Sequence, residues 1–243
     1  MPKNIALILG VGAKDGIGGA LCDKAAGEGY HVVAVGRTED KLNIVSEIIR
    51  KNGGSITPLV ADLAKEQEII KVFDKLDTMT ETLSFVTYNA GNNFREETLK
   101  MDSKFFEEAW RICCFGGFIA GREAARRLSA LGEGSILFTG ATASLRSRPP
   151  FVAFASAKAG LRAVASGLAR EFNPLGVHVA HVIIDGGING DIIRGRAPER
   201  IKDAGENGML LPQAIADNYW QIHLQHPSTW SFEIDLRPYK EVF

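Results

Sequence analysis

Apolar runs alternate with amphipathic stretches along almost the whole chain. The run at 4–10 has no alternating polar positions, which is typical of a strand buried on both faces. Longer stretches, such as 39–52, repeat apolar residues every three or four positions, which predicts helices with one buried face. The predicted strands are 4–10, 31–36, 56–60, 83–88, 135–139, 177–184 and 232–236. The predicted helices are 17–29, 39–52, 65–76, 103–131, 151–172 and 212–226.

This order of elements predicts an α/β fold with a Rossmann-type, doubly wound parallel sheet in three layers. No repeat or linker-like tract interrupts residues 1–243, so we predict a single domain. The one long stretch without a regular pattern is 185–211. Because ligands bind outside the carboxyl ends of the strands in such sheets, we expect this stretch to form a lid over the site.

Composition limits the classes of partner. Of the 243 residues, 45% are hydrophobic and 23% are charged, which supports a large core and argues against global disorder. The net charge is -1 with both signs interspersed, so we expect neither a nucleic-acid nor a membrane partner. Cys22, Cys113 and Cys114 are odd in number and two are adjacent, which suits disulfides poorly. We therefore expect a reducing, cytoplasmic setting.

A glycine-rich turn follows the first predicted strand. Gly12, Gly16 and Gly18 have the spacing Gly-x-x-x-Gly-x-Gly. Glycines permit a tight turn and a close approach of the backbone to a pyrophosphate. The helix that begins near Ile17 would direct its free N–H groups at the same anion. The turn therefore predicts a dinucleotide site.

The end of the second strand indicates which dinucleotide is bound. An NAD site would carry a carboxylate there for the ribose 2′-hydroxyl, but the residue present is Arg37. A guanidinium suits a 2′-phosphate, and Lys14 in the glycine turn adds positive charge. The alternative is a solvated arginine at the start of a surface helix. We predict NADP as the cofactor in preference to NAD.

The predicted helix at 151–172 carries Phe154 and Lys158, which lie one turn apart on the same face. With the glycine turn, this helix resembles that of the short-chain dehydrogenases/reductases, whose active-site helix carries Tyr-x-x-x-Lys. The pairs Asp62-Leu63 and Asn89-Ala90, each at the end of a strand, match the family as well. The resemblance implies a cofactor site formed by Gly12, Lys14, Asp15, Gly16, Ile17, Gly18, Arg37, Asp62, Leu63, Asn89, Ala90, Gly91, Lys158 and Ile188.

The resemblance also implies a catalytic tetrad of Asn, Ser, Tyr and Lys, of which only Lys158 is kept. Cys113 stands at the asparagine position, Ala141 at the serine position and Phe154 at the tyrosine position. A phenyl ring cannot donate a proton, and a positioned acid is worth about 10²–10⁴ in rate. The pattern predicts that cofactor binding is retained and that proton transfer is impaired.

Several hydroxyls and basic groups near these positions are candidates for other roles. Thr142, Ser144 and Ser156 could replace the missing donor, but we favour a structural role for each. We favour core packing for Cys113 over a reactive thiol. The loop residues Arg146 and Arg148 could attract an anionic substrate, although a solvated loop is the simpler interpretation. His223 and His226 have no third ligand, so we expect no metal site.

The resemblance favours an NADP-dependent oxidoreductase that acts on a carbonyl or hydroxyl group of a small molecule, with an unconventional or solvent-derived acid. Two alternatives stay open, a dinucleotide-binding sensor or scaffold without turnover and a lyase or isomerase that reuses the pocket. The usual Pro-Gly pair after the sixth strand is Asp185-Gly186 here. The family also implies a homodimer or homotetramer formed through the helices at 103–131 and 151–172.

Overall fold

The structure, a computed structural model, describes residues 4–242, in which seven parallel strands form one sheet. The strand order is β3-β2-β1-β4-β5-β6-β7, so the winding direction reverses between β1 and β4. This is the switch point at which doubly wound sheets open a crevice for a ligand. The strands are β1 (Asn4–Leu9), β2 (His31–Gly36), β3 (Ser55–Val60), β4 (Thr82–Tyr88), β5 (Ser135–Thr139), β6 (His178–Ile184) and β7 (Glu233–Leu236).

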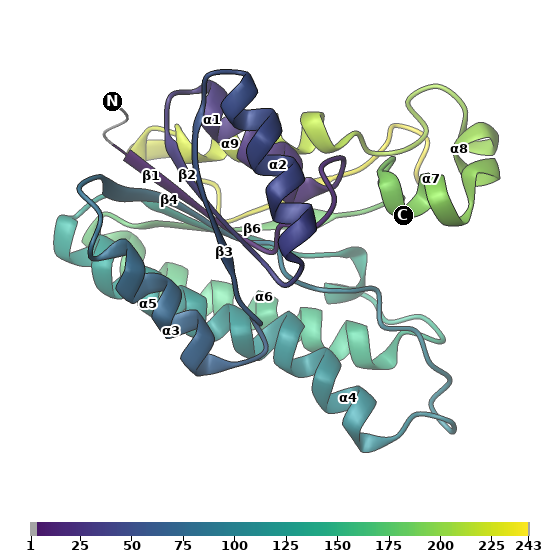
Figure 1. Ribbon diagram of the computed structural model, residues 1–243. Coiled ribbons are helices and arrows are strands. Elements are labelled where there is room, and N and C mark those ends of the chain that lie inside the picture. Colours follow the sequence, from purple (N-terminus) through teal and green to yellow (C-terminus); the bar gives the residue numbers. More distant parts are fainter. Residues whose placement is uncertain (1–3, 243) are drawn as a thin grey trace.

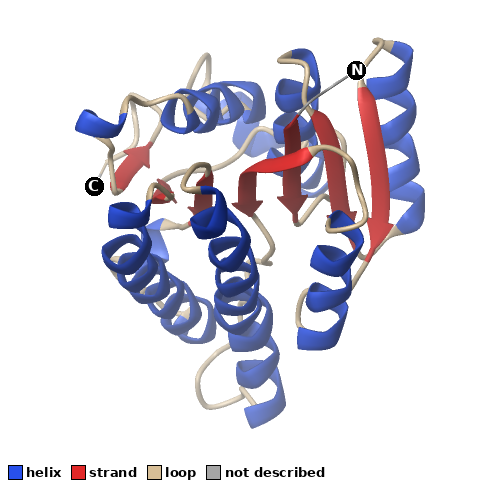
Figure 2. Ribbon diagram, turned by 90° about the vertical axis from the view of Figure 1, so that its left-hand side faces the viewer, coloured by secondary structure: helices blue, strands red, loops and turns tan. Residues whose placement is uncertain are grey.

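Helices cover both faces of the sheet, which confirms the predicted three layers (Figure 1 and Figure 2). One face is covered by α1 (Ile17–Gly27), α2 (Glu39–Lys51) and α9 (Pro212–His223). The opposite face is covered by α3 (Glu66–Leu76), α4 (Ser103–Trp110), α5 (Gly116–Leu131) and α6 (Val152–Phe172). None of the helices within residues 4–242 is long and apolar enough to cross a membrane.

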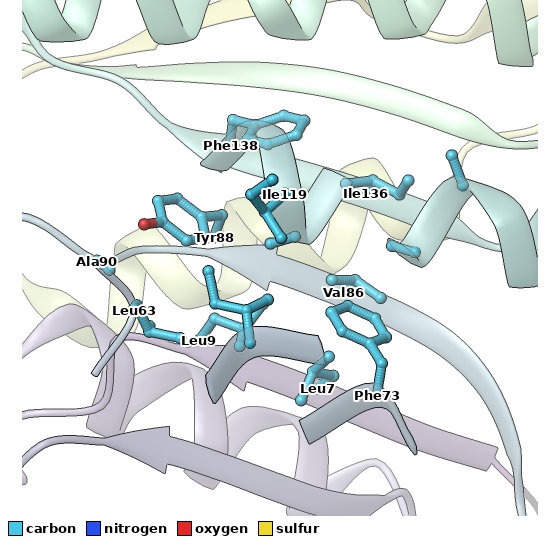
Figure 3. Close-up of a cluster of buried hydrophobic side chains, with 14 of the residues drawn as sticks. Leu7, Leu9, Leu63, Phe73, Val86, Tyr88, Ala90, Ile119, Ile136 and Phe138 are labelled. Carbon is cyan, nitrogen blue, oxygen red and sulfur yellow. The ribbon is translucent and has the colours of Figure 1, made fainter. Parts of the chain in front are cut away.

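The hydrophobic pattern explains these layers. Successive residues of β1 alternate between two cores, with Leu7 and Leu9 in the core beside α3 and α5 and Ile8 in the core beside α1 and α9. Figure 3 shows the first of these cores, where Tyr88 and Phe138 from neighbouring strands pack near Leu9. A strand that is buried on both sides needs apolar residues at every position, which accounts for the uninterrupted apolar run.

Three regions differ from the sequence prediction. The helix expected over 103–131 contains a π-helical turn at Arg111–Phe115, between α4 and α5. The last long helix ends at His223 rather than 226, and a 3₁₀ turn at Pro227–Thr229 follows it. The expectation that 185–211 lacks regular structure was wrong, because it contains α7 (Asp191–Arg196) and α8 (Pro198–Ala204). Helices of six and seven residues are too short to establish a helical period.

The loops that follow the strands lie at the edge of the sheet where a ligand is expected. Helices α7 and α8 lie beyond the carboxyl ends of the strands (Figure 1), in the segment 185–211 that is called the lid below after its expected role. A second long loop runs from the end of β4 to Asp102, whose side chain accepts a 2.7 Å hydrogen bond from the Phe105 N–H and so begins α4. The segments that follow β1, β4, β5 and β6 therefore lie at the same edge of the sheet, where its strands end.

Candidate active site

The glycines of the turn after β1 have different surroundings. Gly10 has a φ of 104°, and a Cβ there would lie 2.4 Å from the Ala90 backbone nitrogen. A Cβ on Gly18 would lie 2.6 Å from the Gly10 carbonyl oxygen. By contrast, a Cβ on Gly12 would meet no atom within 4 Å. Gly10 and Gly18 are thus required for close packing. Gly12 instead borders open space, where a ligand can approach the protein backbone closely.

The N-terminus of α1 faces this open space without a side-chain cap. Gly16 is the N-cap residue, and the first turn of the helix contains no acidic residue. The free N–H groups of an 11-residue helix and its positive dipole end favour an anion at this point. The nearest charged groups are Lys14 and Asp15, whose side chains pair at 3.4 Å. The turn therefore fits a phosphate group, with one positive and one negative side chain beside it.

The end of β2 presents Arg37 to solvent. Its guanidinium makes no hydrogen bond or ion pair with another residue in the described part of the chain, so it is available to a ligand. At the end of β3, the Asp62 carboxylate accepts a 3.1 Å hydrogen bond from the Ala64 N–H, and Leu63 is buried. Asp62 thus forms the local turn into α3, and its carboxylate also lies 3.9 Å from the exposed Lys65 ammonium.

Asn89 connects three strands at their carboxyl ends. Its Nδ2 donates to the Gly10 carbonyl at 3.0 Å, and its Oδ1 accepts from the Thr139 hydroxyl at 3.1 Å. Thr139 in turn pairs with the buried Tyr219 hydroxyl at 2.8 Å. These bonds hold the ends of β1, β4 and β5 in register. Asn89 therefore fixes the edge of the sheet at this point through its side chain.

Lys158 is a buried ammonium at the carboxyl end of β5. Its side chain comes from α6, its exposure is 4%, and its Nζ donates a 2.7 Å hydrogen bond to the Thr139 carbonyl. Phe154 lies one turn earlier on the same face, with its ring centroid 5.8 Å from Nζ, as the spacing predicted. An ammonium has three donors, and this carbonyl is the one acceptor that the described residues supply. Burial lowers the pKa of Lys158, because the interior disfavours its charge.

Gly91 packs closely against both Lys158 and Cys113. A Cβ on Gly91 would lie 3.3 Å from the Cys113 Sγ and 3.5 Å from the Lys158 Nζ. Cys113 is fully buried within the π-helical turn, where the Tyr88 hydroxyl donates to the Ile112 carbonyl at 2.6 Å. Such a turn re-aims side chains relative to a regular helix. Burial raises the pKa of the neighbouring Cys114 to about 11, so this thiol stays protonated.

The hydroxyls near the missing serine and tyrosine positions have partners within the protein. The Ser144 hydroxyl donates to the Ala141 carbonyl at 2.7 Å, and the Ser156 hydroxyl donates to the Ala153 carbonyl at 2.9 Å. Both bonds are local, which agrees with the structural role predicted for these serines. Positions 141 and 154 themselves carry no hydroxyl, since they hold alanine and phenylalanine.

Thr142 makes a contact that the sequence did not indicate. Its hydroxyl donates a short hydrogen bond to the carboxylate of Asp185, which is buried at the base of the lid. The Arg237 guanidinium lies 3.6 Å from the other carboxylate oxygen. Asp185 thus ties the lid to the loop after β5 and to the segment after β7. In the sequence, this contact was indicated only by a hydroxyl in the loop after β5 and a carboxylate in the loop after β6, at Thr142 and Asp185.

The lid begins close to the glycine turn. Ile188 pairs with Leu210 in an isolated β-bridge and packs against the core beside α1. A Cβ on Gly190 would lie 2.6 Å from the Asp15 carbonyl oxygen. The two ends of the lid are therefore joined, and its base rests on the turn. The structure thus brings together residues of the predicted cofactor site that are far apart in sequence.

The two histidines near the end of α9 bond to other side chains, and the Nδ1 of His226 lies 2.8 Å from the Ser228 hydroxyl. Both ring nitrogens of His223 are engaged, Nδ1 with the Ser135 hydroxyl at 2.7 Å and Nε2 with the Tyr30 hydroxyl at 3.0 Å. Among residues 4–242, no group of three or more His, Cys, Asp or Glu side chains is arranged to hold a metal ion.

Known proteins resemble this chain over most of its length. The sequence model of the short chain dehydrogenase family matches residues 4–199. The NADPH-dependent 1-acyldihydroxyacetone phosphate reductase of Saccharomyces cerevisiae is 30% identical over 193 residues, which cover 79% of this chain and 63% of the yeast protein. The match thus spans less than two thirds of the yeast enzyme.

Solved structures share the fold over nearly the whole chain. A short-chain dehydrogenase from Rhodopseudomonas palustris is 36% identical, with a TM-score of 0.84 over 98% of this chain and 100% of its own. A 7α-hydroxysteroid dehydrogenase in complex with NADH and 7-oxo glycochenodeoxycholic acid is 22% identical, with a TM-score of 0.86 over 99% of this chain and 95% of its own. The second likeness concerns the fold alone.

Proposed function

The chain belongs to the short-chain dehydrogenase family, and from this premise we propose that it is an NADP(H)-dependent oxidoreductase acting on a carbonyl or hydroxyl group of a small molecule. The observation that carries the proposal is Lys158, a buried ammonium with a single protein acceptor at the carboxyl end of the sheet. A buried charge is costly unless its donors are satisfied, so the site is suited to a hydroxyl-bearing ligand. A bound nicotinamide cofactor would supply the hydride.

We assign the cofactor's phosphates to the glycine turn. Gly12 leaves space for the pyrophosphate, and the first turn of α1, from Ile17 onward, would offer it free N–H groups. Lys158 would hold the nicotinamide ribose through the donors that Thr139 leaves unused. These contacts involve mainly backbone groups and one ammonium, none of which needs the missing tyrosine.

The preference for NADP over NAD rests on Arg37. Its exposed guanidinium offers a 2′-phosphate a charge-assisted partner, and the position holds no carboxylate for a free 2′-hydroxyl. The yeast relative is NADPH-dependent by name, whereas the hydroxysteroid dehydrogenase structure holds NADH. Since both cofactors occur among similar proteins, Arg37 decides the proposal for this chain.

We propose that the reaction lacks a dedicated side-chain acid. Phe154 and Ala141 have no ionisable group, and Cys113 is buried away from solvent. The proton would then come from water, and reduction of simple carbonyls would be slow because a positioned acid contributes about 10²–10⁴ in rate. A sensor or scaffold without turnover is the second candidate, and the missing tyrosine hydroxyl is the observation that favours it.

Fluorescence titration and turnover measurements test this function together. We expect saturable NADPH binding, and slow NADPH oxidation with reactive aldehydes and diketones. Binding without turnover on such a panel would favour the sensor or scaffold. Failure to bind either NADPH or NADH would contradict the dinucleotide site itself.

We also propose a homodimer or homotetramer. Large apolar side chains are partly exposed on the face formed by α4, α5 and α6, namely Phe106, Trp110, Phe118 and Val152. Apolar patches of this kind are typical of protein–protein interfaces. Light scattering at several protein concentrations would detect the assembly, and a monomer at every concentration would contradict it.

A further inference from the structure

Arg194 links the lid to the glycine turn. Its Nη1 lies 3.2 Å from the Asp15 carboxylate, across 179 positions of sequence. On the lid side, its Nε donates to the Asn189 side-chain oxygen at 3.1 Å and its Nη2 donates to the Asn189 carbonyl at 3.3 Å. The guanidinium is thus oriented from the base of the lid and directed at the turn.

The position of Asp15 places this guanidinium beside the anion site. Asp15 directly precedes Gly16, the N-cap of α1, and Gly190 at the base of the lid packs against the Asp15 carbonyl. A phosphate held by the first N–H groups of α1 would therefore lie next to Arg194. Lys14, a basic residue of the turn itself, also pairs with Asp15.

The Arg194–Asp15 pair is suited to exchange. The side chains are 51% and 26% exposed, and ion pairs in such positions contribute little to stability. A carboxylate beside an anion site repels a pyrophosphate, whereas a guanidinium binds phosphate oxygens through two parallel hydrogen bonds. A bound pyrophosphate would therefore compete with Asp15 for Arg194.

We propose that Arg194 is a ligand of the dinucleotide pyrophosphate, and that it leaves Asp15 for the phosphate when the cofactor binds. The exchange would draw α7 toward the glycine turn and fix the lid over the crevice. This inference rests on the proposed dinucleotide binding and adds a residue of the lid to it. The competing explanation is static, with Arg194 serving only to neutralise Asp15.

A double-mutant cycle with NADPH as the probe separates these explanations. We expect Arg194→Ala to weaken NADPH binding about 5- to 30-fold, since a charge-assisted phosphate contact is lost. Asp15→Asn should tighten binding by a few-fold, about what one exposed charge contributes. Arg194→Ala should weaken binding by a similar factor in the Asp15→Asn background. Arg196→Ala, which removes an equal charge from the same short helix, should change the Kd by less than about twofold.

Two results would overturn the inference. Unchanged NADPH affinity in Arg194→Ala would show that the guanidinium does not reach the phosphate. A loss of affinity that disappears in the Asp15→Asn background would show that Arg194 only neutralises Asp15. If the wild-type chain binds no dinucleotide, the proposed function falls and this inference falls with it, whereas normal wild-type binding with an unaffected Arg194→Ala variant overturns the inference alone.

Limited trypsin digestion gives a second readout that does not depend on affinity. The exposed lid helices contain trypsin cleavage sites at Arg194, Arg196, Arg200 and Lys202, of which every variant keeps Arg200 and Lys202. At saturating NADPH, we expect slower cleavage at these two shared sites in the wild type and in Arg196→Ala. At the same two sites, Arg194→Ala should stay as sensitive as the free protein. Equal protection of Arg194→Ala and wild type would contradict a role of Arg194 in holding the lid.

Discussion

The proposed nucleotide half and the proposed catalytic half of the site lie at the same edge of the sheet but consist of different groups. The nucleotide half is mainly backbone, with the open space at Gly12 and the uncapped N-terminus of α1. Its single discriminating side chain, Arg37, is exposed at the end of β2. A site made of backbone groups depends on glycine positions and helix placement, and both are present.

The catalytic half consists of side chains, of which Lys158 and Cys113 are buried and Phe154 is half-buried. Lys158, Phe154 and Cys113 converge near the end of β5, and two of the three differ from the family pattern. Proton transfer needs particular hydroxyls at particular positions, so single replacements suffice to remove it. If both proposals hold, a backbone-built dinucleotide site tolerates replacements that remove proton transfer.

The largest expected effect comes from rebuilding the catalytic half. The triple variant Ala141→Ser, Phe154→Tyr, Cys113→Asn should raise the rate of NADPH oxidation with reactive carbonyls up to about 10²-fold, the lower end of what a positioned acid supplies. Lys158, beside the new phenol, would favour its ionised form and lower its pKa. Adding one hydroxyl to Phe154 should overpack the core only mildly.

The double variant Ala141→Ser, Cys113→Asn is the matched control, because it lacks the phenol and should gain little. A folded, NADPH-binding triple variant without any gain would show that the crevice has diverged in shape. Brisk turnover by the parent would show that another acid is already in place.

Much of this comparison could be predicted from the sequence, for identifiable reasons. Strands buried on both faces leave uninterrupted apolar runs, and α2 and α3 are long enough to show their buried faces at Leu42, Val45, Ile69 and Val72. Local motifs identified the glycine turn and the Phe154–Lys158 pair. Each of these signals lies within one segment of about twenty residues.

The features that the sequence did not reveal depend on contacts between distant segments. The Thr142–Asp185–Arg237 group and the Arg194–Asp15 pair join loops that follow different strands. The π-helical turn at Arg111–Phe115 has no periodic signal of its own in five residues. Charged residues in loops look alike in sequence whether they are solvated or paired, so their partners had to come from the structure.

The nucleotide half is tested by removing its charged side chain. We expect the wild type to bind NADPH about 10- to 150-fold more tightly than NADH, because a charge-assisted hydrogen bond contributes about 1.5–3 kcal/mol. Arg37→Ala should bind the two cofactors with nearly equal affinity. Titration of both cofactors by fluorescence measures the ratio. Lys41→Ala, an exposed lysine in the following helix, is the charge-matched control. An unchanged ratio in Arg37→Ala would refute the NADP assignment.

Two glycines of the same turn should respond differently to alanine. Gly12→Ala places a methyl in open space, so stability should hardly change while NADPH affinity falls about tenfold through contact with the phosphate. Gly18→Ala places a Cβ 2.6 Å from the Gly10 carbonyl and should cost about 1–3 kcal/mol of stability. Thermal unfolding and NADPH titration of both variants measure the contrast. Equal effects on binding and stability would mean that Gly12 does not border the phosphate.

The smallest expected effect concerns the stability cost of Lys158. A buried ammonium with one protein acceptor destabilises the free protein, and an apolar side chain of similar length avoids that cost. The free energy of unfolding of Lys158→Met should therefore be about 1 kcal/mol higher than that of the wild type, which raises the unfolding temperature. NADPH binding by this variant should weaken about tenfold. The opposite signs would identify the ammonium as a ligand-binding group that is held at the expense of stability.

The dependence on pH gives this last prediction a control within the same protein. Burial lowers the pKa of Lys158, so between its folded pKa and the ordinary value of 10.5 the unfolded chain binds more protons than the folded one. Wild-type stability should rise with pH across that window as the buried lysine loses its charge. The advantage of Lys158→Met in thermal unfolding should therefore be greatest near neutral pH and shrink toward pH 10. A constant advantage at every pH would mean that the gain comes from packing alone, and that the buried charge of Lys158 is already well compensated in the free protein.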